Sequence, residues 1–576
     1  MRRFSSGCFV LLEVDRVEGR RARGRTELQL PDCSAPLLQG WHVRAEGVLR
    51  HPTSGAHPLL PGSAERLARQ GSWSQLRVES IAVLQRPWTP LADLRRRIAR
   101  QLQQAAGPRS GGVLAALVLG SAQVPLPEDL RQAFRVAGLS HALAASGFHL
   151  SVLLGSVLML ARRWPPSLRI PMAGMALLLF VGLAGAQPSV MRAVLMAAIA
   201  LLIRESGQHS RPIGVLVLTL SGMLLLHPAW ARSIGFQLSA AATAGLILTA
   251  PPLEQVLRGC LPDCCRGVAS ALSIPVAALL WTLPLQLLHF GAMPLYALPA
   301  NFLVAPLLAP LTLLAMLTAL LVLVAPPSVL PVLVWPVQQL VGLVMAIANT
   351  ISHWPGAQLL TGRPLGWVVA LLALGLLPWL LGARASRRHW ALLPMLIALL
   401  AHALVQLSDG LVAVERFGRH WLLARHRGRA ALVSTEGDGR SCRMAQRIAA
   451  SYGHARLDWV LLMDPVATEV LPCWQALAWH IEAPQQGRPP IALGQMLRSE
   501  GLSVRRSPHR AGSLQLRVGR QHWQLLPHPQ ALWALQEQQG SAPQPVFTGI
   551  WLGFKPSSMQ RRWLLQHWAG SRFIGL

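Results

Sequence analysis

About ten apolar stretches between residues 138 and 407 constrain the fold of this 576-residue chain more than any other feature. Most are long enough, at about 20 residues, for a helix to cross the hydrocarbon core of a bilayer. Hydrophobic residues make up 52% of the chain and charged residues 13%, which is typical of polytopic membrane proteins. The sequence therefore predicts a polytopic α-helical membrane protein. The predicted spans are 138–160, 170–186, 188–203, 212–227, 233–250, 268–290, 296–325, 328–352, 364–382 and 389–407.

Arginines in the loops between these spans predict the orientation of the bundle. When alternate loops are assigned to the same side, one side holds only Arg232 and Arg363. Because cytoplasmic loops carry an excess of Lys and Arg, the other side is predicted to be cytoplasmic. The N-terminal and C-terminal segments then both lie outside, although a miscount of one span would move the C-terminal segment across. The arginine-rich side holds Arg162, Arg163, Arg169, Arg204, Arg211, Arg258, Arg266, Arg384, Arg387 and Arg388.

Three polar side chains interrupt the first span, GLSHALAASGFHLSVLLGSVLML. At about 100° per residue, His141, Ser146 and His149 share one side of a helix that is continuous through this span. That side is expected to face protein or water, because polar groups at membrane depth avoid lipid. Two interpretations stay open. The polar groups either form hydrogen bonds between helices, with close packing at the glycines of this span, or line a polar path.

Further polar residues lie in the later spans. Arg192 lies in QPSVMRAVLMA, Gln237 in IGFQLSAAATAGLIL, and Asn301 between prolines in LPANFLVAPLLAPL. Gln286 and His289 lie in TLPLQLLHFG. A lone charge in a bilayer costs about 3 kcal/mol or more, so Arg192 is expected to have a partner, a wet cavity or an anionic substrate. A buried ion pair is the alternative, but acidic residues are nearly absent from the predicted spans.

Residues 1–87 are predicted to form a β domain outside the membrane. Short segments such as FVLLEV, TELQL and WHVRAEGVL are separated by turns rich in Gly, Pro and Arg. An oligonucleotide-binding (OB) type barrel is the commonest basic candidate for such a domain. Its DNA-binding candidates lie in one predicted turn, EGRRARGR, where the same side chains could instead only decorate a hairpin tip. They are Arg20, Arg21, Arg23 and Arg25.

The remaining segments flank the bundle. Residues 88–137 are predicted to form an amphipathic lead-in on the membrane surface, because LADLRRRIARQLQQA places apolar residues on one stripe and arginines around it. The bundle itself is assigned to 138–408. Residues 409–576 alternate between strand-like and helical segments, which predicts an α/β domain.

Charge and cysteines constrain the function less. The net charge of +29 permits anionic partners such as nucleic acid or lipid headgroups, but a codon bias towards Arg explains it equally well. The seven cysteines lack zinc-ribbon spacing, and the adjacent Cys264 and Cys265 have no histidine at metal-ligand spacing. Cys8 and Cys33 could form a disulfide if their domain is extracytoplasmic.

Four segments carry a family resemblance through their order and spacing. They are GLSHALAASGFHLSVLLG, QPSVMRAVLMA, HPAWARSIGFQLSAAATAGLIL and LPLQLLHFGAMPLYALPANFLVAPLLAPL. Together they resemble the ComEC competence family of inner-membrane DNA-uptake channels. The stretch PLLPGSAERLARQGSWSQLRVESIAVL also looks like the extracytoplasmic OB-like domain of that family, so the resemblance covers most of residues 8–405.

The resemblance implies a multi-pass protein of the bacterial cytoplasmic (inner) membrane that translocates single-stranded DNA during natural transformation. Its implied partners are single-stranded DNA, a competence DNA receptor, cytoplasmic DNA-handling proteins and membrane lipid. No cofactor is implied, and a homo-oligomer is left open. Polar positions that match the family motifs are candidates for the transport path or its structural support: His141, Ser146, His149, Arg192, Gln237 and Asn301.

The chain departs from the family pattern at both ends. Family members usually begin with hydrophobic helices before the barrel, whereas this chain has no evident signal peptide and begins almost at the barrel. We therefore expect either a truncated start or a loss of those helices. Many members also end in a metallo-β-lactamase-like domain with a metal-chelating HxHxDH run, and LLMDPVATE stands at that place here.

The substituted run predicts a degenerate metallo-β-lactamase-like domain. Asp464, Val466, Thr468 and Glu469 stand in the four ligand positions. Val466 cannot bind a metal and Thr468 is a poor ligand, whereas a two-metal hydrolase needs a cluster of imidazoles and carboxylates. The domain is therefore expected to hold no metal and to have no enzymatic activity.

Two other functions remain as alternatives. An intramembrane serine protease would use Ser146 with the distant His289 as its base, although AASGF lacks the expected GxSG context. A small-molecule permease or a membrane scaffold without DNA transport is the second alternative.

Overall fold

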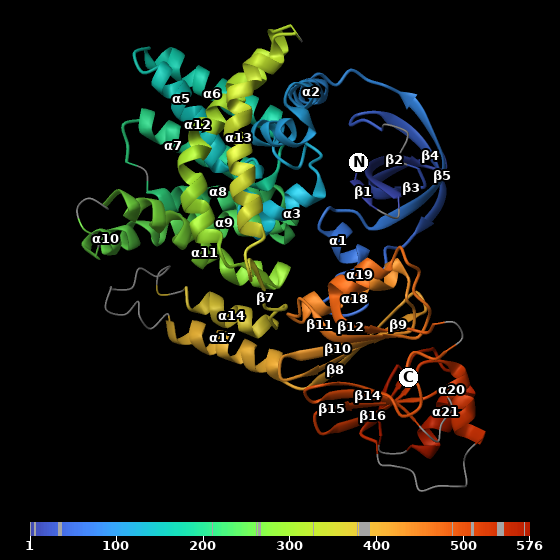
Figure 1. The fold of residues 1–576 in the computed structure, drawn as a ribbon. Coiled ribbons are helices and arrows are strands. Elements are labelled where there is room, and N and C mark those ends of the chain that lie inside the picture. The colour runs from blue at the N-terminus through green and yellow to red at the C-terminus, as the bar shows by residue number, and fades with distance from the viewer. Residues whose placement is uncertain are drawn as a thin grey trace.

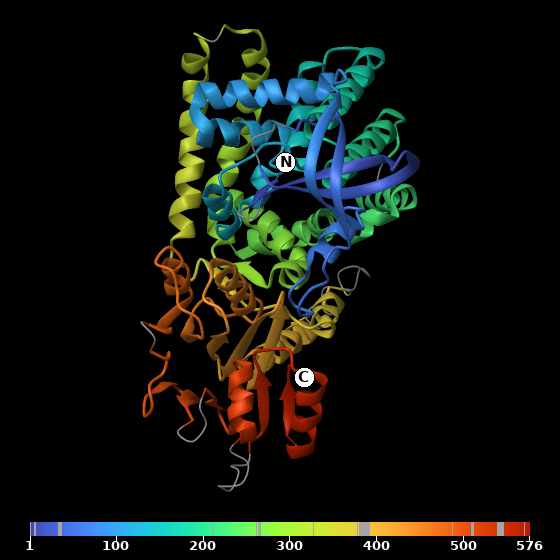
Figure 2. The ribbon, with the colours of Figure 1, turned by 90° about the vertical axis from the view of Figure 1, so that its right-hand side faces the viewer.

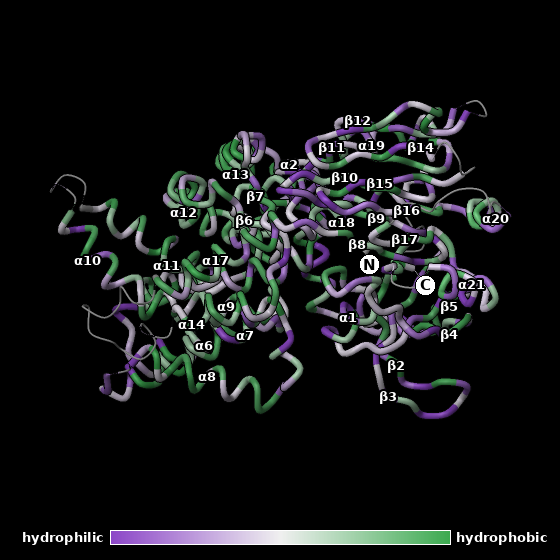
Figure 3. Tube along the Cα trace, turned by 90° about the horizontal axis from the view of Figure 1, so that it is seen from below, coloured by the Kyte–Doolittle hydropathy of each residue, from purple (hydrophilic) through white to green (hydrophobic). Residues whose placement is uncertain are grey.

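The computed structural model describes residues 2–575 apart from 5–6, 33–36, 210, 261, 263–265, 327, 377, 379–391, 486–487, 508–511, 538–546 and 569–570. An N-terminal β domain, a helical bundle and a C-terminal α/β domain follow one another along the chain (Figure 1). Figure 2 shows the C-terminal domain below both other regions. Apolar residues predominate in the helices of the bundle, and polar residues are more frequent in the two flanking domains (Figure 3).

The N-terminal domain is a five-stranded sheet with one short helix. The strand order is β1-β2-β3-β5-β4, in which β3 and β5 are parallel and the other neighbours antiparallel. Its small core contains Cys8, Leu28, Leu30 and Val78. The elements are β1 (Arg2–Phe4), β2 (Gly7–Val17), β3 (Arg20–Leu30), β4 (His42–Arg50), α1 (Ser63–Ala68) and β5 (Ser74–Gln85).

The arginine-rich segment is a strand in this domain. Val17 pairs with Arg20, so the turn between β2 and β3 consists only of Glu18 and Gly19. Both residues have positive φ angles, 49° and 79°, as a two-residue hairpin turn requires. The prediction that Arg20, Arg21, Arg23 and Arg25 lie in a turn is therefore wrong, because these exposed residues belong to β3.

The bundle packs around α2, α12 and α13. Helix α2 bends at Gly107, which has a φ of 78° and precedes Pro108. After the bend, residues 111–119 of α2 are buried in the main apolar core with α12 and α13. Part of the segment expected on the membrane surface thus forms the interior of the bundle.

The helices and short strands of this region have the following bounds: α2 (Pro90–Leu119), α3 (Glu128–Val136), α4 (Ser140–Leu143), α5 (Gly147–Leu160), α6 (Pro166–Ala184), α7 (Pro188–Glu205), α8 (Pro212–Leu226), η1 (Pro228–Arg232), α9 (Ile234–Leu248), α10 (Ala250–Cys260), α11 (Arg266–Phe290), β6 (Ala292–Pro294), α12 (Ala297–Val324), α13 (Leu330–Ser352), β7 (Gln358–Leu360), α14 (Gly366–Leu374) and α17 (Leu392–Leu407).

Several of these helices are suited to a membrane. Among the described residues, α6, α11, α12 and α13 are long and apolar enough to cross one. The pair α9 and α10, bent by 48°, is a fifth candidate if it forms one span. Helices α5, α8 and α17 are apolar but shorter. The chain has the helices of a membrane protein, while the number of about ten spans stays a prediction.

The first predicted span is not one continuous helix. Helix α4 ends at Leu143 and α5 begins at Gly147, with extended backbone at Ala144 and Ser146. The backbone N–H of Ser121 donates a hydrogen bond to the carbonyl of Leu143 at 2.8 Å, which occupies an acceptor near the end of α4. The prediction that His141, Ser146 and His149 share one helix is therefore wrong, because the break separates His141 from the other two.

The C-terminal domain is a sandwich of two sheets with helices on both outer faces. An apolar core lies between the sheets, and separate cores lie beneath α18 and α19 on one side and α20 and α21 on the other. One sheet has the order β12-β11-β10-β9-β8 and the other β13-β14-β15-β16-β17-β18. Figure 1 shows α20 and α21 on the far side of the second sheet.

The elements of this sandwich are β8 (Gly410–Arg416), β9 (Arg419–His426), β10 (Arg429–Ser434), α18 (Gly439–Ser451), β11 (Leu457–Leu462), α19 (Leu471–Leu477), β12 (Ala478–Glu482), β13 (Met496–Ser499), β14 (Leu502–Arg506), β15 (Leu514–Val518), β16 (Gln521–Leu526), α20 (Pro529–Glu537), β17 (Gly549–Leu552), α21 (Ser558–His567) and β18 (Arg572–Ile574).

Disulfides occur in both flanking domains. Cys442 on α18 is bonded to Cys473 on α19, with 6.3 Å between their Cα atoms. Cys8 is also disulfide-bonded. Cys33, which the sequence suggested as its partner, lies outside the described residues, as do Cys264 and Cys265.

Candidate functional site

The beginning of α5 places two of the predicted polar residues together. Ser146 is the N-cap residue of α5, and its Oγ lies 3.0 Å from Nδ1 of His149 in a hydrogen bond. The side chain of His149 is buried, with 1% of its surface exposed. Its Nε2 has no hydrogen-bond partner in the part of the chain that the structure describes. One polar atom of this pair is therefore free for a further contact.

Arg192 faces this pair from α7. An added Cβ at Gly147 would lie 3.6 Å from Nη2 of Arg192, so the guanidinium lies within van der Waals range of the beginning of α5. The Nε of Arg192 donates a hydrogen bond to Oγ of Ser239 on α9 at 2.8 Å. Its Nη1 lies 3.3 Å from Sδ of Met196. We call Ser146, His149, Arg192 and Ser239 the inner polar cluster.

The charge of Arg192 has no local counter-ion. Only 8% of Arg192 is exposed, yet no ion pair with an Asp or Glu is formed within the described ranges. A buried cation without a carboxylate is unfavourable, because it has lost water without gaining an opposite charge. The inner polar cluster can therefore bind an anion, with the guanidinium as the charged donor and the hydroxyls and imidazole as further polar groups.

A second polar pair lies near the beginning of α9. The Oε1 of Gln237 lies 2.7 Å from Nε2 of His289 on α11, and its Nε2 donates to the carbonyl of Ala231. Gln237 is two residues from Ser239 on α9, which places the two side chains on different sides of that helix. Ser146 bonds His149 and His289 bonds Gln237, which differs from the Ser146–His289 dyad that a serine protease would have used.

The other predicted residues form no hydrogen bond with the cluster among the described residues. His141 lies on α4, within range of an electrostatic interaction with His149. Asn301 donates from Nδ2 to the carbonyl of Ala297 one turn earlier on α12, which is a hydrogen bond within its own helix. The arginines of β3 belong to another domain, where Arg25 donates to the carbonyl of Gln70 at 3.4 Å. Three of the six transport candidates, Ser146, His149 and Arg192, therefore come together, and Gln237 lies on the same helix as Ser239.

Sequence reasoning missed the importance of two residues. Ser239 and Gly147 both contact or approach Arg192 but were not among the candidates. Ser239 lies in the GFQLS block that supported the family resemblance, and Gly147 directly follows Ser146. Their positions in or beside the family motifs could have marked them as candidates. Only the packing of α5, α7 and α9 places them near Arg192.

The edge of the C-terminal sandwich has a different arrangement of charges. Arg419 donates from Nε to Glu436 at 2.6 Å and from Nη2 to Asp438 at 2.8 Å. The hydrogen bond with Glu436 raises the pKa of Arg419 above its usual range. Asp438 also accepts the backbone N–H of Ser441 and thus caps α18. Both carboxylates are engaged by groups of the protein.

The residues at this edge do not fit a two-metal site. Asp464 directly follows strand β11, and partial burial raises its pKa. Val466 and Thr468, which occupy two of the four expected ligand positions, offer no imidazole or carboxylate. Among the described residues, no three His, Cys, Asp or Glu side chains are placed so that they could share a metal ion.

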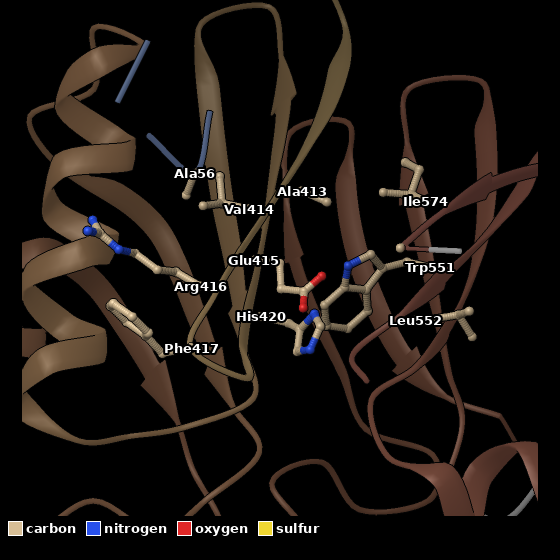
Figure 4. Close-up of a pocket in the computed structure, with 11 residues that line it drawn as sticks. Ala56, Ala413, Val414, Glu415, Arg416, Phe417, His420, Trp551, Leu552 and Ile574 are labelled. Carbon is tan, nitrogen blue, oxygen red and sulfur yellow. The ribbon is translucent and has the colours of Figure 1, made fainter. Parts of the chain in front are cut away.

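A cavity of about 480 Å³ opens at the edge of the sandwich. Figure 4 shows Glu415 and His420 beside the indole of Trp551. Glu415 and His420 are opposite each other on β8 and β9, and Trp551 belongs to β17 of the second sheet. Burial lowers the pKa of His420, which favours its neutral form. The cavity is distant in the fold from Arg192, so the candidate site in the bundle does not include it.

A model of the family described as "Competence protein" matches residues 117–386, which include the entire inner polar cluster. The chain is therefore similar to the ComEC competence family over 270 of its 576 residues. Its similarity to the ComE operon protein 3 of Bacillus subtilis (strain 168) is 28% identity over 277 residues, 46% of this chain and 34% of that protein. No solved structure matches the chain.

A second relative is similar over a shorter range. The uncharacterized protein YcaI of Escherichia coli (strain K12) is 26% identical over 239 residues, which cover 39% of this chain and 31% of YcaI. The chain thus spans about a third of the length of the curated relatives that it matches. The family match and the apolar helices support a membrane protein.

Proposed function

We propose that this chain is a channel that moves single-stranded DNA across the bacterial cytoplasmic membrane during natural transformation. The observation that carries the proposal is the buried guanidinium of Arg192, which has a hydroxyl partner in Ser239 but no carboxylate within the described ranges. A phosphodiester supplies the missing negative charge only while DNA is present. The family match supports the choice of DNA over other anions.

The inner polar cluster explains how a strand could pass without being held too tightly. Arg192 offers a charged donor to one phosphate at a time, because its Nε and Nη1 contact Ser239 and Met196 while its Nη2 lies at the beginning of α5. Ser146 and His149 supply neutral hydrogen-bonding groups beside it. A site that binds each phosphate weakly and lets the next one replace it permits conduction along a polymer.

The N-terminal domain is proposed to capture the strand outside the membrane. Its five strands and the parallel pairing of β3 with β5 support an OB-like barrel. The exposed arginines of β3 supply positive charge for a phosphate backbone. They are Arg20, Arg21, Arg23 and Arg25.

The C-terminal domain is proposed to be a metallo-β-lactamase-like domain without hydrolase activity. Two sheets between two helical layers support that likeness. The ligand positions at Val466 and Thr468 do not suit a metal, and Arg419 binds the nearby carboxylates of Glu436 and Asp438. The Cys442–Cys473 disulfide supports an extracytoplasmic location, because disulfides persist in oxidising compartments.

The proposed partners follow from the family and from the location in the inner membrane. A competence DNA receptor would deliver the strand from outside, and cytoplasmic DNA-handling proteins would receive it. Membrane lipid would surround the apolar helices α6, α11, α12 and α13. A homo-oligomer is compatible with this arrangement.

Complementation in the native host tests the proposal. The gene is deleted and then restored as wild type, as Arg192→Ala, or as Arg204→Ala, which changes an exposed arginine at the other end of the same helix α7. Uptake of labelled DNA into the cytoplasm should be lost on deletion and in Arg192→Ala, although that variant reaches the membrane. Wild type and Arg204→Ala should restore it. Intact transformation after deletion in a competent host would refute the channel and favour a small-molecule permease or scaffold.

A further inference from the structure

A loop of the N-terminal domain is inserted into the C-terminal domain. Residues 51–62 connect β4 to α1, and Leu60 of this loop is 8% exposed. Leu60 belongs to the apolar core beneath α18 and α19, and Ala56 packs against the same core. Figure 1 shows α1, which follows the loop, above α18 and α19. The first and the last domain of the chain are thus joined by an apolar contact.

Hydrogen bonds hold this loop from outside. Arg363 donates from Nη1 to the carbonyl of Leu59 at 3.0 Å, and its backbone N–H donates to the carbonyl of Ser451 at 2.9 Å. Arg416 on β8 donates from Nη2 to Oγ1 of Thr53 at 3.1 Å. The segment after β7 and the C-terminal domain therefore both contribute to the position of the loop.

His57 fixes the turn that presents Leu60. The backbone N–H of Leu59 donates to Nδ1 of His57 at 3.2 Å, and the N–H of Leu60 donates to the carbonyl of His57 at 2.8 Å. A ring nitrogen that accepts a hydrogen bond carries no proton, so Nδ1 is unprotonated and the proton of the neutral imidazole is on Nε2. The inserted loop thus contains His57 in its neutral form.

The other ring nitrogen of His57 contacts the C-terminal domain. Its Nε2 lies 3.3 Å from Oη of Tyr452, which directly follows α18. With the proton on Nε2, the imidazole is the donor of this hydrogen bond. The guanidinium of Arg425 on β9 lies 4.5 Å from the ring centroid of Tyr452. One neutral imidazole therefore connects the turn of the loop to the domain that receives it.

A second proton on His57 is incompatible with this arrangement. Protonation of Nδ1 would make it a donor, and it would then face the N–H of Leu59, which is also a donor. The hydrogen bond within the turn would be lost, and the backbone that places Leu60 beneath α18 and α19 would have to change. Insertion of the loop and protonation of His57 therefore oppose each other.

The surroundings of His57 offer no counter-ion for an imidazolium. No Asp or Glu forms an ion pair with His57 in the part of the chain that the structure describes. Glu65 of α1 already uses its two carboxylate oxygens for two backbone N–H groups of the loop. The charged side chains that contact the loop or Tyr452 from other elements are cations. They are Arg363, Arg416 and Arg425.

We propose that His57 is a pH-sensitive latch between the N-terminal and C-terminal domains: its neutral imidazole keeps Leu60 inserted, and its protonation releases the loop. This role does not depend on whether DNA passes through the bundle. It gives the C-terminal domain a function that needs no catalysis, because that domain holds the N-terminal domain in place.

The sign of the pH dependence follows from burial. The released loop binds a proton near the ordinary pKa of 6.5, whereas burial lowers the pKa of His57 in the inserted loop. Insertion is therefore fully stable above pH 6.5 and weakens as the pH falls below 6.5.

Hydrogen exchange of the full-length protein in phosphatidylcholine nanodiscs tests the latch. Mass spectrometry follows peptides that cover residues 53–62, and the rates are corrected for the intrinsic pH dependence of exchange. Between pH 7.5 and pH 5.5 the protection of these amides in wild type should fall by about three- to tenfold. Unchanged protection in wild type would overturn the latch.

A conservative variant and a matched control assign the effect to His57. The side-chain oxygen of His57→Asn still accepts the N–H of Leu59 but does not titrate, so protection should be the same at both pH values. His51→Asn changes an exposed histidine of the same loop and should keep the wild-type pH dependence. A wild-type loss of protection at pH 5.5 in His57→Asn, or a loss already at pH 7.5, would overturn the latch.

Tyr452→Phe tests whether the latch acts between the domains. This variant removes the partner of Nε2 but leaves the turn of the loop unchanged, so protection at pH 7.5 should fall by about fivefold. Full protection in Tyr452→Phe would show that the turn alone protects the loop and would overturn a latch between domains.

Discussion

Arg192 in the bundle and Arg419 in the C-terminal domain are both shielded arginines, but their surroundings differ. Arg419 bonds two carboxylates, Glu436 at 2.6 Å and Asp438 at 2.8 Å. Arg192 bonds the hydroxyl of Ser239 and contacts the sulfur of Met196. The first cation is neutralised by its own domain, whereas the second is left with neutral partners in the described part of the bundle.

This difference indicates which of the two regions can act on an external anion. A guanidinium that already holds two carboxylates gains little from a phosphate, because it would have to give up its existing partners. A guanidinium without a counter-ion gains the full interaction when a phosphate arrives. The guanidinium of Arg419 is thus neutralised within its own domain, whereas that of Arg192 can still bind an external anion.

The largest expected effect concerns the disulfide that holds the closed edge. Cys442→Ser with Cys473→Ser should destabilise the C-terminal domain by about 3 kcal/mol, because the bond closes a loop with a sequence separation of 31. Pulse proteolysis of the full-length protein measures the change. Cys260→Ser, at a free and exposed cysteine, is the control and should have no effect. If the double Cys→Ser variant were as stable as wild type, the disulfide would make no contribution to the stability of the C-terminal domain.

Acidic pH should destabilise the C-terminal domain. Burial lowers the pKa of His454 in the C-terminal domain to about 4, so the folded domain keeps this imidazole neutral. Below the ordinary pKa of 6.5 the unfolded chain binds a proton that the folded domain does not, so stability is lost as the pH falls from 6.5 towards 4. Between pH 7 and 5 the loss should be about 2 kcal/mol. His454→Gln should remove most of this pH dependence in proteolysis, and an unchanged dependence would contradict it.

Removal of the two arginines should have opposite consequences for stability. Arg419→Met should cost about 1–2 kcal/mol, because two partly exposed carboxylates lose their cation. Arg192→Met should leave the stability of the bundle unchanged or higher, since it removes a buried charge that has no carboxylate partner. Thermal unfolding in detergent, with local cleavage sites assigned to each region, measures both. A large loss of bundle stability in Arg192→Met would contradict the view that Arg192 is a buried charge without a stabilising partner.

The smallest expected effect concerns Asp438, which caps α18 and also forms an ion pair with Arg419. Asp438→Asn keeps an N-cap acceptor for the N–H of Ser441 but loses the charge opposite Arg419, so it should cost only a few tenths of a kcal/mol. Asp438→Ala also loses the cap and should cost about 1 kcal/mol. Chemical denaturation monitored by proteolysis compares the two variants. Equal losses would show that the ion pair, rather than the cap, stabilises the domain.

Much of the candidate site could be predicted from sequence, and the part that could not depends on a break in a helix. The spacing of Ser146 and His149 predicted that they lie on one side, and the structure places them in a hydrogen bond. The same argument wrongly included His141, because Ala144–Ala145 favours helix in isolation. The contact of Leu143 with Ser121 and the close approach of Ala145 to Gly120 are made by the loop after α2, which local sequence does not reveal.

The N-terminal domain shows the same limit at a turn. Gly19 marked a turn between two strands, but the following arginines also resembled loop sequence. The pairing of β3 with both β2 and β5 extends the strand through Arg20–Leu30, because two neighbours supply its backbone hydrogen bonds. Strand length here depends on partners that are distant in sequence.

By itself, the sequence determined that this chain has the apolar helices of a membrane protein and that it resembles the competence family. Apolar composition and helical length suffice for the first conclusion, and the order of motifs for the second. The tertiary structure alone decided which charges are neutralised. Whether Arg192, Arg363 or Arg419 has a carboxylate within reach depends on how helices and domains pack, because electrostatic interactions act across space and not along the chain.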